Sequence, residues 1–383
     1  MSRPTFTSIA LVALTLVPGC GAGDRETATP FPLMHAPRIA HTQTRLRDGR
    51  VLLAGGVQHL KQILPPANTD VEIYDPDTHM FTIVARTTTV RAFHTATLLD
   101  DGRVVFIGGS PGHVIEVCDV DAAAVTPAGN IRHPRMMHTA TLLTDGRILI
   151  VGGMTEEVTY ADGTFKPRYA FLDSVEIYDP RSGDSVDFPV RLAVRRRGHT
   201  ATLLSDGRVF IIGGSRKTAT ALIDVAAGTI TPGPPLKLPR EDHRTTRLDD
   251  GRLLVSGGTS PQGVSLDAAE VYDPATGEFR LIEHLMVQRR EDHTANLLPD
   301  GRVLITGGED NHSGKDQRDL VLDNVEVFDP ATETFSKLPS LIVRRDEHAS
   351  SVLDDGRVLI TGGADDNEYG HHTAEILSAD AAD

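Results

Sequence analysis

Residues 91–109, RAFHTATLLDDGRVVFIGG, contain the pattern that decides the fold. Two short apolar runs flank an Asp-Gly pair, and this pair supplies the positive φ that a tight hairpin turn needs. The stretch therefore predicts an antiparallel β-hairpin with a type I′ turn. The closing Gly108-Gly109 pair predicts that the chain bends after the second strand, at a place where a Cβ would obstruct it.

The same pattern recurs seven times with fixed internal spacing. An Asp-Gly-Arg tripeptide begins at Asp48, Asp101, Asp145, Asp206, Asp250, Asp300 and Asp355. A Gly pair follows and begins at Gly55, Gly108, Gly152, Gly213, Gly257, Gly307 and Gly362. A His precedes each tripeptide at His41, His94, His138, His199, His243, His293 and His348. An Arg precedes each His at Arg38, Arg91, Arg135, Arg196, Arg240, Arg290 and Arg345. Internal repetition of this kind is typical of repeat folds.

Two further strands complete each repeat unit. A third strand reads VEIYDP at residues 71–76 and 175–180, and its Asp-Pro end predicts a turn because Pro cannot donate to a strand ladder. A fourth, less regular strand is expected around Phe81, Phe279 and Phe335. Four short antiparallel strands in each of seven units predict an all-β chain folded as a seven-bladed β-propeller.

These units resemble kelch repeats, the motif family shared with galactose oxidase, over about residues 27 to 383. The fourth-strand aromatic is Phe and never Trp, and the third strand is degenerate in units two and four. The resemblance implies the activity of a copper-radical oxidase as one alternative. Such an oxidase requires a Tyr–Cys crosslink, further Tyr and two His ligands around the copper. Cys118 is the one Cys within the propeller and occupies the strand position that Tyr74 and Tyr178 fill elsewhere. The sequence therefore argues against that chemistry.

The seventh unit ends at residues 374–377 without a fourth strand. We expect residues 26–34 to supply it, so that the N-terminal stretch closes the ring and removes two exposed strand edges. The strand directions place the tight turns on one face of the propeller. The variable loops and the Arg-x-x-His openings share the other face, which we call the loop face.

The N-terminal residues differ from the repeats. Arg3 precedes an apolar run, residues 9–17, that is too short to span a bilayer and fits a signal peptide over residues 1–20. Residues 17–20, VPGC, resemble a bacterial lipobox, which predicts lipidation of Cys20; cleavage near residues 19–22 with release of the protein is the alternative. Residues 21–26 are interpreted as a short linker and 27–383 as the propeller. We expect an exported protein of the bacterial cell envelope, either an outer-membrane lipoprotein or periplasmic.

Charge and Cys content limit the partners. The net charge of −15 argues against nucleic acid, because phosphate contacts need clustered Lys and Arg. The membrane is expected to be contacted through the lipid anchor only. Two Cys give no disulfide framework if Cys20 is lipidated or removed. A monomer is expected.

The repeated Arg and His residues have two interpretations. Clustered His suggests a metal site, whereas a residue present in every blade is expected to serve the blade itself. We favour the architectural interpretation and assign no metal. A Glu in the third strand recurs as well, with Ala221 in unit four, and is expected to pair with the repeated Arg across blades; its members are Glu72, Glu116, Glu176, Glu270, Glu326 and Glu375.

The two residues between Arg and His break the sevenfold repetition, because they become acidic in units five to seven. The predicted acidic patch on the loop face contains Glu241, Asp242, Glu291, Asp292, Asp346 and Glu347, with Asp310, Asp365 and Asp366 from neighbouring loops. Crowded carboxylates raise one another's pKa unless a cation or Arg neutralises them, and hard oxygen ligands suit Ca²⁺. The alternative is solvated loops paired with Arg289, Arg290 and Arg344. No cofactor other than this cation is expected.

Two classes of function remain open. The first is a binding scaffold that presents its loop face to a protein or glycan partner, with specificity in the longest loops, residues 57–69, 154–173 and 309–323. The second is an envelope carbohydrate-active enzyme, a sugar isomerase or oxidase, as the kelch resemblance implies. The chain has no Ser-His-Asp, P-loop or HExxH pattern, so no catalytic residue is assigned. An enzyme would depend on residues such as His243, His293 and Asp346.

Overall fold

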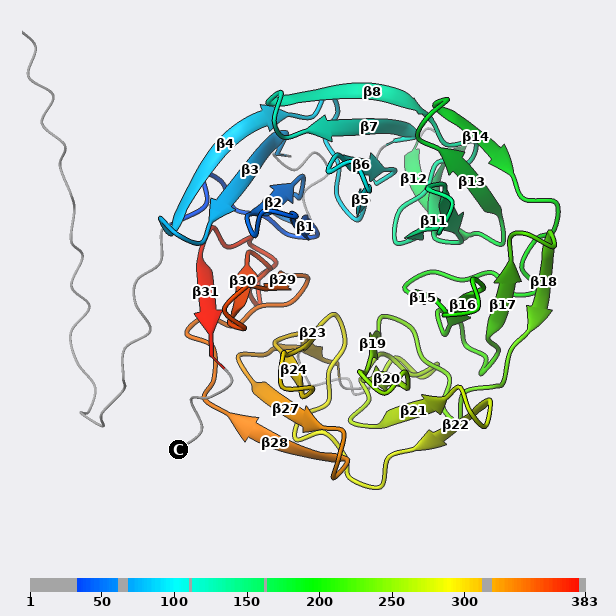
Figure 1. Cartoon of the computed structure of the whole chain (residues 1–383), viewed down its shortest axis with the longest axis vertical. Coiled ribbons are helices and arrows are strands. Elements are labelled where there is room, and N and C mark those ends of the chain that lie inside the picture. The colour runs from blue at the N-terminus through cyan, green and yellow to red at the C-terminus, as the bar shows by residue number, and fades with distance from the viewer. Residues whose placement is uncertain (1–32, 61–67, 110–111, 162–163, 312–318, 379–383) are drawn as a thin grey trace, which may run out of the picture.

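The computed structural model describes residues 33–60, 68–109, 112–161, 164–311 and 319–378. Within these ranges every regular element is a β-strand, and no helix capable of crossing a membrane is present. Figure 1 shows seven sheets arranged around a central axis, each with its first strand nearest the axis. The chain is an all-β, seven-bladed propeller, as the repeat pattern predicted.

Blades 1 to 4 are four-stranded sheets. Blade 1 comprises β1 (Thr42–Arg45), β2 (Val51–Ala54), β3 (Asp70–Asp75) and β4 (Met80–Arg86). Blade 2 comprises β5 (Thr95–Leu98), β6 (Val104–Ile107), β7 (Val114–Asp119) and β8 (Ala124–Asn130). Blade 3 comprises β9 (Thr139–Leu142), β10 (Ile148–Val151), β13 (Val175–Asp179) and β14 (Asp184–Asp187). Blade 4 comprises β15 (Thr200–Leu203), β16 (Val209–Ile212), β17 (Ala221–Asp224) and β18 (Thr229–Pro232).

Blades 5 to 7 follow the same plan. The propeller also contains two inserted hairpins, one in blade 3 and one in blade 6, each between the second and third strands of its blade. Blade 5 comprises β19 (Arg244–Arg247), β20 (Leu253–Ser256), β21 (Ala269–Asp273) and β22 (Glu278–Leu281). Blade 6 comprises β23 (Thr294–Leu297), β24 (Val303–Thr306), β27 (Val325–Asp329) and β28 (Thr334–Leu338). Blade 7 comprises β29 (Ala349–Val352), β30 (Val358–Thr361) and β31 (Ala374–Leu377). The inserted hairpins are β11 (Met154–Ala161) with β12 (Thr164–Phe171), and β25 (Glu309–Asp310) with β26 (Leu320–Val321).

The Asp-Gly turns differ from the expected type I′ geometry. In blade 1 the Leu46 and Arg50 backbones pair around a three-residue loop, and Gly49 alone has positive φ, 86°. This is the type I turn with a left-handed Gly that three-residue hairpin loops favour. Arg50 Nε donates to Asp48 Oδ2 at 2.7 Å and its amide donates to Oδ1, which explains why Arg follows Asp-Gly in every unit.

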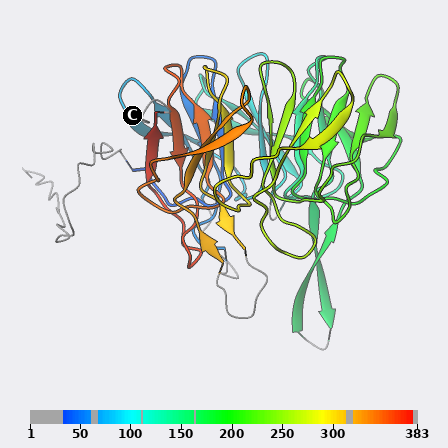
Figure 2. The same ribbon diagram turned by 90° about the horizontal axis from the view of Figure 1, so that it is seen from below.

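The inserted hairpins mark the loop face. Seen from the side in Figure 2, β11–β12 extends away from the body of the propeller, on the face opposite the Asp-Gly turns. The Gly pairs and Arg-x-x-His openings lie at the base of these insertions, because Met154 pairs with Met136 and Glu309 pairs with Glu291. The loop face therefore carries both the variable segments and the openings of the units.

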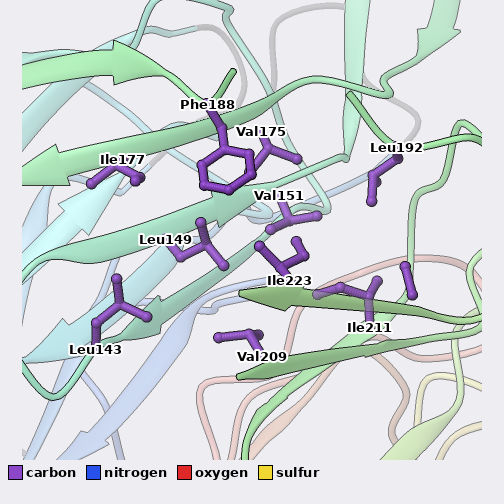
Figure 3. Close-up of a cluster of buried hydrophobic side chains, with 11 residues drawn as sticks. Leu143, Leu149, Val151, Val175, Ile177, Phe188, Leu192, Val209, Ile211 and Ile223 are labelled. Atoms are coloured by element: carbon purple, nitrogen blue, oxygen red, sulfur yellow. The ribbon is translucent and has the colours of Figure 1, made fainter. Parts of the chain in front are cut away.

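The core lies between adjacent blades. The second strand of every blade is fully buried, and apolar side chains of one sheet pack on the next. Figure 3 shows the cluster between blades 3 and 4, where Leu149 and Val175 meet Ile211 and Ile223. Burying one such side chain stabilises the fold by about 1.5–3 kcal/mol, so these clusters are the main source of its stability.

The ring closes between blade 7 and blade 1 through described residues. Gly363 donates its amide to the Arg38 carbonyl at 2.8 Å, and His41 bonds the Thr361 hydroxyl. The Met34 amide donates to the His372 carbonyl beside β31, and its side chain packs in the cluster between these two blades. Residues 26–32, most of the predicted closing strand, lie outside the described residues, as does Cys20; the closing strand stays a prediction.

Candidate functional site

Each repeated Arg is buried and spans its own blade. Its Nη1 donates to the carbonyl of the first Gly of the pair, at 2.5–3.3 Å in all seven blades. In six blades it also forms an ion pair with the third-strand Glu, as Arg240 does with Glu270 at 3.0 Å. The pairing lies within one blade, so the expectation of pairing across blades is wrong. The reason is that Arg reaches the third strand of its own sheet.

The repeated Glu also fixes the crossover from the preceding blade. Glu270 accepts the backbone amides of Lys237 and Leu238 at 2.7 and 3.0 Å. Glu326 and Glu375 accept two crossover amides in the same way. A carboxylate held by one Arg and two amides is a fully satisfied buried charge, which a packed fold requires. These residues are therefore architectural in the structure.

The repeated His residues join neighbouring blades. In five blades the His Nε2 bonds a Thr hydroxyl from the inner strand of the preceding blade at 3.0–3.2 Å, as in the Thr42–His94 pair. Burial lowers the pKa of every one of these imidazoles, to about 3 for His41 and His138. A neutral ring whose Nε2 already has a partner is a poor candidate ligand. The seven His do not converge on a shared metal position.

The residue before each His forms a ring around the central axis. All seven have left-handed φ between 45° and 55°, and they are Ala40, Phe93, Met137, Gly198, Asp242, Asp292 and Glu347. The amide of each of the first six donates to the carbonyl of its predecessor at 2.8–3.2 Å, with Ala40 donating to Glu347. We call this set the mouth ring. The backbone conformation is the same at all seven positions whereas the side chains differ, so the blades differ from one another in side-chain chemistry at this ring.

The mouth ring borders a cavity of about 460 Å³ on the loop face. One side is apolar, with Phe93 and Met137. The other side is acidic, and five of the nine predicted patch residues line it: Glu241, Asp242, Glu291, Asp292 and Glu347. Arg197, Arg216 and Asn311 complete the polar side. The cavity thus presents an apolar wall opposite a wall of carboxyl groups.

The carboxyl groups of the cavity have raised pKa values. Burial raises the pKa of Glu291 to about 9 and that of Asp292 to about 7, with repulsion from neighbouring carboxylates adding to both. Burial also raises the pKa of Glu347 well above its usual value and, outside the cavity lining, that of Asp346 to about 8. Several of these groups therefore keep a proton near neutral pH and act as hydrogen-bond donors as well as acceptors.

Two arginines moderate this acidity. Arg197 contacts Glu241 at 3.3 Å and Asp242 at 3.1 Å, and it has a cation–π contact with Phe171 of β12. Arg244 begins the inner strand β19 at the position of the repeated Thr, and it lowers the pKa of Asp242, Asp292 and Glu347. His293 consequently bonds Ser256 Oγ at 2.9 Å in place of that Thr. Sequence reasoning missed Arg244, although an Arg in the Thr position was a usable signal.

The other four predicted patch residues lie outside the cavity lining. Asp346 is buried and pairs through its backbone with Ala364. Asp310 accepts from Gln288 Nε2, and Asp366 accepts the Val321 amide at 3.0 Å. Asp365 accepts the amides of two residues in its own loop. The loop carboxylates thus stabilise loops, and Arg344 contacts one of them, Asp366, at 3.8 Å.

The acidic wall does not form a preassembled metal cage. Among the described residues, one group of three potential ligand atoms lies within 4.8 Å of one another, and it comprises His133, Glu176 and Asp187. Glu176 is already bound by Arg135 at 2.5 Å, which leaves that group as part of the blade architecture.

A second cavity, of about 700 Å³, lies on the turn face and is lined by Asp-Gly-Arg loops of blades 1 and 2. Because that loop recurs in every blade, we place the candidate site at the mouth ring.

The described residues do not fit a copper-radical centre. Cys118 is buried in β7 within an apolar cluster, and burial raises the pKa of its thiol to about 12. The third-strand Tyr74 and Tyr178 are buried in their blades, and their hydroxyls bond His79 and the Ala128 carbonyl. None of these side chains lines the mouth-ring cavity.

Comparisons with known proteins agree with this fold. The model of the Kelch motif family matches residues 296–342. A solved fungal alcohol oxidase of the AA5 family, in complex with copper, is similar with a TM-score of 0.72 and 18% identity, covering 92% of this chain and 77% of that one. The solved structure of YjhT has a TM-score of 0.61 and 14% identity, covering 78% of this chain and 98% of that one. No curated protein matches the sequence. The seven repeat units, the blade geometry and the family match together identify the chain as a seven-bladed β-propeller that contains a Kelch motif at residues 296–342 and has the fold of the AA5 alcohol oxidase.

Proposed function

We propose that the chain is a glycan-binding module that takes a neutral or amino sugar into the mouth-ring cavity. The observation that carries this proposal is the division of one cavity into an apolar wall and a carboxyl wall. A sugar ring has an apolar face and a rim of hydroxyls, each of which both donates and accepts hydrogen bonds. Ligand cavities of a few hundred cubic ångströms, with a few convergent polar groups, suit molecules of this size.

The mixed protonation of the carboxyl wall supports the same ligand class. Glu291, with a pKa of about 9, and Glu347, with a pKa well above its usual value, keep a proton at pH 7 and can donate. Arg197 lies within ion-pair distance of Glu241 and Asp242 and lowers the pKa of both against the rise from burial, which favours these two carboxyls as acceptors. Hydroxyl groups satisfy donors and acceptors alike. A negatively charged sugar would meet repulsion at this wall, so acidic glycans are disfavoured.

The test is a glycan array of neutral, amino and acidic sugars, followed by calorimetry on each hit. Asp292→Asn and Phe93→Ala are expected to weaken binding at least tenfold. The first removes a carboxyl group from the acidic wall, and the second removes an aromatic ring from the apolar wall. Arg47→Gln, on the turn face, is the control and should leave affinity unchanged. Binding that survives both cavity variants, or an array without hits, contradicts the proposal; capture of a protein partner through the outer loops would then take its place.

A second candidate is acid–base catalysis on a sugar, a carbohydrate isomerase. The observation that favours it is the pKa of about 7 for Asp292, beside carboxyls of higher pKa, because groups that titrate near working pH transfer protons well. Incubating sugar hits in D₂O and following C–H exchange by NMR tests this candidate. Loss of exchange in Asp292→Asn, measured at a sugar concentration that saturates the weakened site, would support it, and absence of exchange in the native protein would remove it.

The export and the lipid anchor remain proposals that rest on residues 1–20. Metabolic labelling with a radioactive fatty acid in a bacterial host is expected to label the native chain and not Cys20→Ala. Unlabelled native chain recovered as released protein would favour simple signal cleavage.

A further inference from the structure

Blade 4 departs from the other six blades at one buried charge. Arg196 is 1% exposed and donates to the Gly213 and Ala219 carbonyls, as the repeated Arg does elsewhere. The third-strand position that holds Glu in the other six blades is Ala221. Blade 4 therefore buries the guanidinium of Arg196 without the Glu carboxylate that pairs with the equivalent Arg in the other six blades.

The register shows that Ala221 stands at the site of the missing carboxylate. Ala221 lies opposite Ile211 and Pro232, and Glu270 of blade 5 lies opposite the corresponding Val255 and Leu281. Ala221 belongs to the apolar cluster between blades 3 and 4, which also contains Leu192 of the crossover, labelled in Figure 3. Leu192 immediately precedes the crossover residues that such a carboxylate would contact.

Two backbone amides of blade 4 stand at the chain positions that bind this carboxylate in blade 5. In blade 5 the carboxylate accepts the amides of Lys237 and Leu238, the third and second residues before the Arg. Their counterparts in blade 4 are Ala193 and Val194, for which the described residues provide no acceptor. In the other six blades the Nη2 of the repeated Arg binds the Glu carboxylate, whereas the hydrogen bonds of Arg196 to described residues use Nη1 alone. The surroundings of this arginine thus retain donors for an anion after the anionic side chain has been removed.

We propose that blade 4 binds a small monovalent anion, chloride in the first instance, between Arg196 and the Ala193 and Val194 amides. The anion occupies the volume of the absent Glu carboxylate and neutralises the buried charge. Burial lowers the pKa of Arg196 to about 10, and no carboxylate opposes the shift as Glu270 does at Arg240. A guanidinium with two amides is a set of charge-assisted donors suited to an anion.

The experiment measures Tm of the full chain against chloride concentration, with gluconate replacing chloride at constant ionic strength. Above the dissociation constant, each tenfold rise in chloride is expected to raise Tm by about 2 °C for a chain of this size. Ala221→Glu rebuilds the ion pair, so it should raise Tm without chloride and abolish the chloride dependence. Glu270→Ala, at the same register in blade 5, should add a second site and steepen the dependence.

A bromide soak supplies a measurement that does not depend on the variants folding. Anomalous diffraction is expected to place bromide against Arg196 in the native crystal. The proposal is overturned if no bromide peak lies there, or if native protein and Ala221→Glu respond equally to chloride. Either result would mean that water satisfies these donors.

Discussion

Single residues decide which positions of this repeat are free for function. The inner strand of five blades begins with a Thr that holds the next blade's His, so that position is committed to architecture. In blade 5 the Ser256 hydroxyl bonds His293 instead, and Arg244 is released from that role. Its guanidinium lowers the pKa of three carboxyls of the mouth ring and so offsets part of the rise that burial causes.

Arg244→Thr should therefore make stability more sensitive to alkaline pH. The mouth-ring carboxyls have folded pKa values above their unfolded ones, so the stability that they contribute below pH 4 is lost as pH rises through the folded pKa. Without Arg244 these pKa values rise further, and each added unit costs about 1.4 kcal/mol at pH 9. Urea unfolding at pH 6.5 and pH 9 measures the difference. Arg247→Thr, in the same strand at the turn face, is the control; an equal effect of both variants would contradict the role of Arg244.

At the scale of the element, the Gly pair is a contact between blades as well as the end of a strand. In every blade the amide of the second Gly donates to the carbonyl of the next blade's Arg at 2.8–2.9 Å. A Cβ on Gly109 would lie 2.7 Å from the Ala92 carbonyl oxygen and 2.9 Å from His94 Cβ. The hairpin therefore ends in Gly because two chain segments approach closely there.

Gly109→Ala and Gly102→Ala separate this close approach from backbone strain. Both positions have φ near 90°, but a Cβ on Gly102 would meet nothing within 4 Å. We expect Gly102→Ala to cost about 1 kcal/mol, from left-handed strain alone. Gly109→Ala should cost about 3 kcal/mol or more, because the opening of the blade must move. Chemical denaturation of the two variants gives the comparison, and equal losses would show that strain alone explains the Gly pair.

The fold was predictable from the sequence because it depends on features repeated seven times. The turn type was wrong because Asp-Gly fits two hairpin loops, and only the backbone shows that Asp48 and its Arg50 partner belong to the three-residue form. The candidate site was predictable in part. The loss of repetition in units five to seven indicated the acidic wall. The apolar wall of Phe93 and Met137 was not predicted, because these residues face the acidic ones only once the closed ring brings blades 2 and 3 opposite blades 5 to 7.

At the scale of the molecule, burial of seven neutral His and seven Arg links folding to pH. The His side chains are buried in every blade, and those of blades 5 and 6 are fully so. The same seven positions hold adjacent blades together, because each His bonds a hydroxyl in the preceding blade. Protonation of any of them is therefore unfavourable for the whole ring.

We predict that stability is greatest between about pH 6.5 and 7. The His pKa values are lowered on folding, so their contribution is present above pH 6.5 and is lost as pH falls, by about 1.4 kcal/mol per pH unit for each ring. The carboxyls with raised pKa act in the opposite direction: their contribution declines as pH rises above about 4 and is fully lost once pH passes their folded pKa values of about 7 to 9, so above pH 6.5 they alone lower the stability. Calorimetric Tm values from pH 5 to pH 9 test this profile; a maximum at pH 5 would contradict it.

The mouth ring has one further consequence. Since its main chain is fixed by amide-to-carbonyl bonds from blade to blade, the side chain at each of the seven positions can be exchanged without redrawing the backbone. The seven positions around the opening of the propeller can then change independently. The ligand selectivity of the cavity can change by substitution in one blade at a time, while the backbone of the propeller is unchanged. Descendants of this chain could acquire new specificities through single substitutions at Ala40, Phe93 or Met137.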